Sequence, residues 1–187
     1  MTGERRHFPR AERLVAALEA VNEAVGRAVA WLLVALVGVV VLVVALRYGF
    51  DIGSIALQEA ALYLHAFAFM LGVAYTLRHD GHVRVDIFYR RLSPRGRAAV
   101  EMGGTLLLLL PLMGFILIAS WGYAAGSWAR LEGSPEPGGL PLVFLLKSAI
   151  PAMALLMLLQ GAALALRSAI LLAGGRMADA EPAPREL

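Results

Sequence analysis

Long runs of uncharged, mainly apolar residues alternate with short charged segments along the chain. Four of these runs have about the 18–20 residues that cross the core of a bilayer as an α-helix; they are residues 28–46, 60–77, 102–121 and 148–166. We therefore predict an all-α integral membrane protein with four transmembrane helices, over about residues 28–47, 54–77, 99–121 and 141–167. These helices form a membrane domain over residues 28–172, and the remaining segments are too short for a soluble domain of ordinary size.

Residues 1–27 precede the first predicted span and have a different pattern. From Arg10 onward an apolar stripe recurs at helical spacing, formed by Leu14, Leu18, Val21 and Val25. We expect an amphipathic helix that lies in the cytoplasmic interface of the membrane or packs against a partner. Residues 173–187 are rich in Gly, Ala, Pro and charge, and we expect them to form a disordered cytoplasmic tail.

Basic residues are concentrated on one side of this four-span topology. The N-terminal segment, the loop between the second and third spans, and the C-terminal tail hold fourteen of the seventeen Lys and Arg residues. Because cytoplasmic loops collect Lys and Arg, both termini are predicted to be cytoplasmic. The basic pI of about 9.7 is therefore explained by arginines that orient the protein in the membrane. Nucleic acid is accordingly not an expected partner. The absence of cysteine excludes disulfides and thiolate metal sites.

Two ionisable side chains lie inside predicted spans, where they are costly and therefore candidate functional residues. Glu59 lies about one helical turn inside the second span, and Lys147 about two turns inside the fourth, both counted from the non-cytoplasmic end. One interpretation is an ion pair between them that fixes the register of two helices. The other interpretations are a pair with a partner subunit and a proton or ion relay.

His65 lies near the middle of the second span, with Gln58 seven residues earlier on the same helix face. No second histidine is expected at this depth, which excludes a haem held by this chain alone and favours a hydrogen bond between helices. Pro111 predicts a kink in the third span. Gly103 and Gly104, at the start of that span, predict a close helix contact.

The loop after the second span contains the most distinctive segment of the chain, Gly-His-Val-Arg-Val-Asp at residues 81–86. Gly81 permits a turn, and Ser93 followed by Pro94 is typical of a helix start. The sequence has no Gly-x-Ser-x-Gly, His-Glu-x-x-His or phosphate-loop motif. We therefore expect no enzyme activity and no cofactor.

Three features of the chain together resemble a known family. They are a carboxylate in the outer part of the second span (Glu59), a later glycine in that span (Gly72) and the 81–86 segment. This is the small membrane subunit, often called the Q subunit, of tripartite ATP-independent periplasmic (TRAP) transporters. The resemblance covers about residues 29–166, and within the loop its strongest positions are Gly81, His82, Val85 and Asp86. The Pro- and Gly-rich outer loop, residues 133–141, resembles the branch labelled mannitol/chloroaromatic or 2-oxo-acid type.

The resemblance implies a scaffold subunit in the bacterial inner membrane, surrounded by lipid. Its implied partners are a large membrane subunit, which holds the substrate and sodium sites and moves as an elevator, and a periplasmic protein that captures an organic acid. A scaffold laid against a larger partner favours helices spread in a layer over a closed bundle.

The resemblance also implies roles for particular residues. Glu59 and Lys147 would lock helices or the partner interface, and Arg84 and Asp86 would fix the cytoplasmic loop. The outer loop, from Glu132 through Glu136 to Pro141, would help to dock the binding protein.

Two other functions stay open at this point. A stand-alone ion-coupled carrier, working as a homo-oligomer through Glu59, predicts transport by the purified chain alone. A membrane anchor of a redox complex, with His65 as one haem ligand and a partner supplying the other, predicts a Soret band.

Overall fold

In the computed structural model, which describes residues 8–82, 89 and 91–175, every long regular element is a helix. Four helical segments are long and apolar enough to cross a membrane, with α4, a π-helical turn η1 and α5 forming one of them. The expected all-α class with four spans is therefore confirmed. The elements are α1 (Pro9–Phe50), α2 (Ile55–Arg78), α4 (Pro94–Gly104), η1 (Thr105–Leu109), α5 (Leu110–Ala129) and α6 (Val143–Leu172).

From Pro9 onward, the N-terminal segment and the first span form one continuous helix, α1. Pro9 occupies the first turn of α1, where its missing N–H leaves no hydrogen bond unmade. The helix ends at Asp51, which has a left-handed backbone conformation. Ser54 then caps α2 by accepting a hydrogen bond from the amide of Leu57 (3.4 Å).

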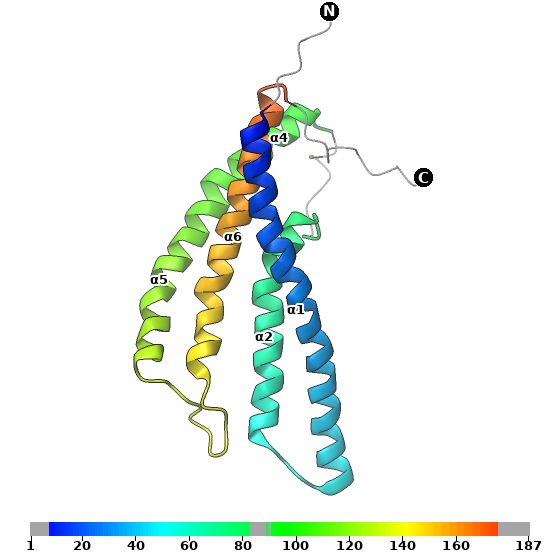
Figure 1. The fold of residues 1–187 in the computed structure, drawn as a ribbon, viewed down its shortest axis with the longest axis vertical. Helices are drawn as coiled ribbons and strands as arrows, with labels where there is room; N and C mark the ends of the chain where they lie inside the picture. The colour runs from blue at the N-terminus through cyan, green and yellow to red at the C-terminus, as the bar shows by residue number, and fades with distance from the viewer. Residues whose placement is uncertain (1–7, 83–88, 90, 176–187) are drawn as a thin grey trace, which may run out of the picture.

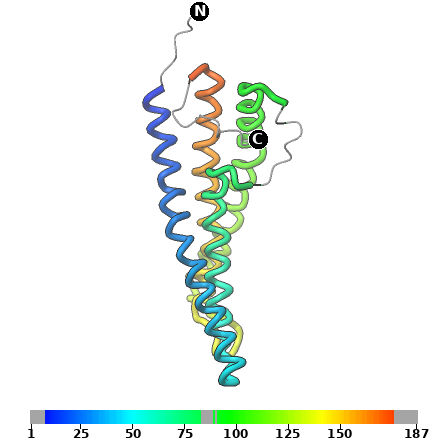
Figure 2. Tube along the Cα trace, turned by 90° about the vertical axis from the view of Figure 1, so that its right-hand side faces the viewer, coloured from blue at the N-terminus to red at the C-terminus, as the bar shows by residue number. Residues whose placement is uncertain are grey.

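The helices form two antiparallel hairpins, α1–α2 and α5–α6, and α6 packs on α1, α2, α4 and α5. At the end that carries the loop between α5 and α6, the four spans stand side by side in a row (Figure 1). Turned by 90°, the same row is seen edge-on as a thin layer (Figure 2). At this end the described spans therefore form a single layer, whereas farther from the loop α1 packs on α6 as well as on α2 (Figure 2).

The two ends of this layer differ. At one end lie the α5–α6 loop (residues 130–142) and the turn between α1 and α2; we call it the loop end. At the other, which we call the terminal end, lie the start of α1, the end of α6 and α4 (Figure 1). There α1 and α4 lie on opposite sides of α6 (Figure 2). The start of α1 extends well beyond the end of the shorter helix α2 (Figure 1).

Most of the apolar surface of the spans is exposed in the isolated chain. In the most hydrophobic window of α6, 44% of the residues are buried, but only 6% are buried in that of α1. Large side chains such as Trp31, Val37, Phe69 and Ile118 point outward. Such a surface needs lipid or another membrane protein around it.

Pro111 lies two residues after the end of the π-helical turn η1. A proline in a helix removes one backbone hydrogen bond and its ring collides with the carbonyl four residues earlier, so the preceding turn widens. Leu109 and Leu110, at the end of this turn, pack against Gly161 of α6, where a Cβ atom would lie 3.0 and 2.8 Å from their side chains. No close contact between described helices forms at Gly103 and Gly104, since a Cβ there would meet nothing within 4 Å.

Candidate functional site

Glu59, near the start of α2, holds the α5–α6 loop. Its carboxylate accepts hydrogen bonds from the backbone amide of Leu140 (2.6 Å) and from the hydroxyl of Ser134. Both carboxylate oxygens therefore accept hydrogen bonds from one loop, whose bonded residues lie 75 and 81 positions away in sequence. Hydrogen bonds to a charged acceptor are stronger than neutral ones, so this contact fixes the loop against the end of α2.

Lys147, in the second turn of α6, binds the other end of the same loop. Its ammonium lies 2.8 and 2.7 Å from the two carboxylate oxygens of Glu132, and 4.2 Å from the centre of the Tyr123 ring. The hydrogen bond from Lys147 lowers the pKa of Glu132, so this carboxylate stays charged at neutral pH. Of the three interpretations of these residues, the Glu59–Lys147 ion pair is not formed, because each of the two side chains instead holds part of the α5–α6 loop.

The close fit around Glu59 depends on glycine. Gly138 has a left-handed backbone conformation, with φ of 79°, which glycine adopts without strain. A Cβ atom on Gly139 would lie 2.4 Å from the Ser134 hydroxyl oxygen and 2.8 Å from a Glu59 carboxylate oxygen. Glu136, by contrast, is exposed at the tip of the loop, where its side chain is accessible to a partner.

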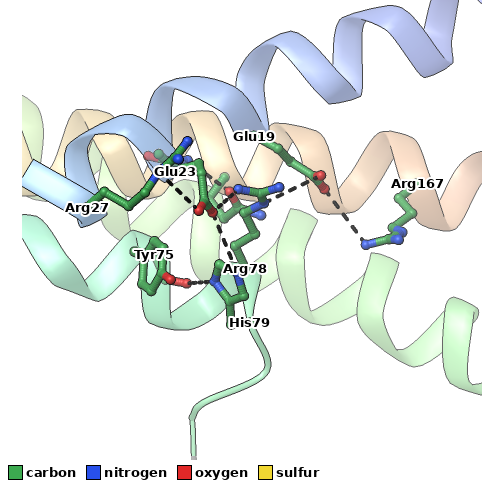
Figure 3. Close-up of polar contacts among 9 residues, drawn as sticks. Glu19, Glu23, Arg27, Tyr75, Arg78, His79 and Arg167 are labelled. Atoms are coloured by element: carbon green, nitrogen blue, oxygen red, sulfur yellow. Dashed lines mark hydrogen bonds and ion pairs between the residues drawn. The ribbon is translucent and has the colours of Figure 1, made fainter. Parts of the chain in front are cut away.

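At the terminal end, six charged or ionisable side chains form a charge cluster that joins α1, α2 and α6 (Figure 3). Glu19 of α1 lies 3.7 Å from Arg78 of α2 and 3.8 Å from Arg167 of α6. Glu23, one turn later, pairs with Arg78 as well. The cluster consists of Glu19, Glu23, Arg27, Arg78, His79 and Arg167.

Further contacts secure Glu23 from its own helix and from the end of α2. Arg27 lies 3.4 Å from Glu23 along α1, and the His79 ring lies 3.5 Å from it across the helices. The His79 ring also contacts Tyr75, with ring centres 4.2 Å apart. Because Arg78 is the last residue of α2, the cluster lies where that helix ends.

A buried polar pair and a glycine contact continue this packing toward the middle of the layer. The Asn22 amide donates to the Gln160 side-chain oxygen (2.9 Å), and the two residues are 1% and 3% exposed. Gly26 allows α1 to approach α2, because a Cβ there would lie 2.2 Å from the ring of Tyr75 and 2.6 Å from its Cβ.

These contacts on α1 were missed in the sequence. The buried positions of the first turns are Val15, Glu19, Asn22, Gly26 and Val29, whereas Leu14 and Val21 of the expected apolar stripe are exposed. The helical spacing of 15, 19, 22, 26 and 29 was itself a signal. The polar residues within it concealed that signal, because a buried helix face is usually recognised by apolar residues.

The connection after α2 is described only in part. The amide of Asp80 donates to Leu77 (3.3 Å) and that of Gly81 to Thr76 (2.9 Å), which is a Schellman termination with Asp80 in the left-handed conformation. His82 is half-buried in the groove between α1 and α2, and its Nδ1 atom meets no hydrogen-bond partner among the described residues. The predicted roles of Arg84 and Asp86 lie outside the described residues.

The start of α4 is as predicted. Ser93 caps the helix by accepting a hydrogen bond from the Gly96 amide (3.2 Å), and Pro94 is its first residue. This cap prediction is confirmed.

Gln58 and His65 lie on the exposed face of α2. The ring of His65 stacks on Phe69, with ring centres 6.5 Å apart. Neither Gln58 nor His65 forms a side-chain hydrogen bond with another described residue, so the hydrogen bond between helices expected for His65 is not made within the described part of this chain. Within the described parts of the chain no group of three or more His, Asp or Glu side chains is placed to bind a metal.

The fold and these contacts define a multi-pass α-helical membrane protein whose ionisable groups join helices to each other and to a loop. The family described as "Tripartite ATP-independent periplasmic transporters, DctQ component" matches residues 36–170, so the chain belongs to the small membrane subunits of TRAP transporters. The family resemblance found in the sequence is thereby confirmed. No curated protein and no solved structure matches the chain.

Proposed function

We propose that the chain is the scaffold subunit of a sodium-coupled, binding-protein-dependent importer of organic acids. In this role it stabilises the large membrane subunit and presents the α5–α6 loop to the periplasmic binding protein. The observation that carries the proposal is the exposed layer of helices, in which only 6% of the α1 window is buried. A layer with so much apolar surface supports a larger membrane partner better than a self-contained carrier.

The polar contacts of Glu59 support the same role. A relay carboxylate must be free to exchange a proton or cation, whereas both Glu59 oxygens accept hydrogen bonds from the α5–α6 loop. This arrangement favours an assembly function over a stand-alone carrier working through Glu59. We further propose no catalytic role and no cofactor for this subunit.

The distribution of Arg and Lys supports a location in the bacterial inner membrane with both termini in the cytoplasm. The α5–α6 loop then faces the periplasm, where its exposed Glu136 is available to the binding protein. The resemblance of this loop to the mannitol/chloroaromatic or 2-oxo-acid branch implies an organic-acid substrate of that kind.

Purification of the tagged chain from its host in a mild detergent tests the proposal. We expect a large multi-pass membrane protein to co-purify in equal amount, and sodium-dependent organic-acid uptake by vesicles only when both subunits and the binding protein are present. A chain that purifies alone as a stable homo-oligomer and transports by itself would overturn the proposal.

The docking role has a separate test, because the chain has no cysteine of its own. A single cysteine at Glu136, carrying a photo-reactive group, is expected to cross-link the binding protein. The same label at Asp51, in the turn between α1 and α2 at the loop end, is the matched control. Equal cross-linking from both positions, or none from Glu136, would contradict docking on this loop.

A further inference from the structure

His65 is an exposed polar side chain in the middle of a membrane span. It is preceded by ten residues of α2 and followed by thirteen, which places it about 15 Å from one end of the helix and about 20 Å from the other. An imidazole is too short to reach water across such distances. Its ring nitrogens form no hydrogen bond with a described residue, and its one close ring contact is the stacked Phe69.

A neutral imidazole has one N–H donor and one acceptor nitrogen, and hydrocarbon satisfies neither. Leaving such groups unpaired in a bilayer is unfavourable, which is why polar residues in spans usually meet another helix. Phe69, whose ring centre lies 6.5 Å from that of the imidazole, is apolar and satisfies neither nitrogen. The surface around His65 therefore needs a partner that brings a hydrogen-bonding group to this depth, which lipid chains cannot do.

The surroundings of His65 have a shape that suits a helix. One groove, of about 590 Å³, lies between α1 and α2 and is lined by Leu33 and Gly72. A second, of about 440 Å³, lies between α2 and α6 and is lined by Leu62 and Ile150. His65 lines both grooves, so it stands on the ridge between two apolar depressions that can receive side chains from an opposing helix.

Gln58 extends this ridge by two helical turns toward the loop end. It is also exposed and forms no side-chain hydrogen bond with a described residue. The face thus carries two unpaired polar groups separated by apolar Leu62, which is 57% exposed. This pattern is typical of a helix contact in which a few polar groups set the register within an apolar interface.

We infer that the face of α2 formed by Gln58, Leu62, His65 and Phe69 is the surface on which a transmembrane helix of the large subunit packs. That helix presents a hydroxyl, an amide or a freed backbone carbonyl to His65. The inference rests on the proposed function, because the large subunit is the membrane partner implied by the family. It goes further by assigning one face of the layer and one register-setting side chain.

Site-specific cross-linking tests the face. Single cysteines at Phe69 (70% exposed) and at Ile118 of α5 (78% exposed) are matched in exposure and in mid-helix position. Each carries a photo-reactive group in membranes that contain the co-expressed large subunit. We expect the label at Phe69 to cross-link the large subunit at least about fivefold more than the label at Ile118.

Substitution tests the side chain. His65→Leu is expected to lower the association constant of the two subunits about threefold or more, the usual effect of one hydrogen bond between membrane helices. His65→Gln, which keeps a donor and an acceptor, is expected to retain most of the affinity. Ile118→Ala is the control and is expected to leave the association unchanged.

The outcomes separate this inference from the proposed function. If the unmodified chain brings down no large subunit, both are overturned. If the complex forms but the label at Phe69 reaches only lipid or a second copy of this chain, or cross-links no better than Ile118, the assigned face is wrong. If His65→Leu binds as well as the unmodified chain, the role of the imidazole is wrong.

Discussion

The two ends of the helix layer use charged side chains in different ways. At the terminal end, Glu19 and Glu23 of α1 meet arginines of two other helices, so the charges join helix to helix. At the loop end, Glu59 and Lys147 each hold part of the α5–α6 loop, so the charges join helix to loop. The same residue types therefore set helix packing at one end and the shape of a connecting loop at the other.

This difference predicts separable effects. Contacts between helices contribute to the stability of the whole layer, whereas a loop held by side chains can open locally without unfolding the helices. Substitutions at the terminal end should therefore lower global stability. Substitutions at the loop end should change the mobility of residues 130–142 and leave the midpoint of unfolding nearly unchanged.

The largest effect is expected from Gly26→Ala. The added methyl group would lie 2.2 Å from the Tyr75 ring and would force α1 away from α2, which typically costs about 1–3 kcal/mol. Gly38→Ala in the same helix is the control, because its methyl group meets nothing within 4 Å and alanine favours helix by up to about 1 kcal/mol. Thermal unfolding in detergent measures both variants. Equal midpoints would refute tight packing at Gly26.

Asn22→Leu should have the next largest effect. It leaves the buried side-chain oxygen of Gln160 without its donor, which costs about 1–3 kcal/mol. The double variant Asn22→Leu/Gln160→Leu replaces both partners and should recover most of the loss. Unfolding of the single and double variants forms a double-mutant cycle. Strictly additive losses would show that the two side chains do not interact.

Glu59→Ala should loosen the α5–α6 loop without destabilising the helices. The Leu140 amide loses an acceptor at 2.6 Å. Because this hydrogen bond goes to a charged group, its loss should raise the hydrogen-exchange rate of that amide about tenfold. Hydrogen exchange of residues 130–142 measures this change. Glu136→Ala, at an exposed position in the same loop, should leave the exchange as it was. A large fall in the unfolding midpoint of Glu59→Ala would contradict a local role.

The smallest effect is expected from pH. Because Lys147 lowers the pKa of Glu132 in the folded protein, this pair stabilises the closed α5–α6 loop at pH values above the ordinary carboxyl value of 4.5. The stabilisation is lost as the pH falls below 4.5 and through the folded pKa. Glu132→Gln removes the titration, so the difference in hydrogen exchange of residues 130–142 between the two proteins, compared at each pH, should shrink below pH 4.5. A difference that stays constant from pH 7 to pH 3.5 would exclude this contribution.

Local features of the fold were predictable because their causes lie within a few residues of one another. The four spans follow from apolar runs of sufficient length. The start of α4 follows from Ser93 and Pro94, which satisfy the free amides at a helix start. The continuity of α1 was not predicted, because the pattern changes from charged to apolar near residue 28 and was divided there. Such a change does not itself interrupt a helix.

The sequence alone determined the class of protein, its four spans and its family, since hydrophobic length and short motifs are properties of neighbouring residues. Only the tertiary structure decided which partners Glu59 and Lys147 bind, because depth in a membrane does not specify the path of the α5–α6 loop. It also decided that α1 buries Glu19 and Asn22. The polar residues on that face conceal its helical periodicity, because a buried helix face is usually recognised by apolar residues.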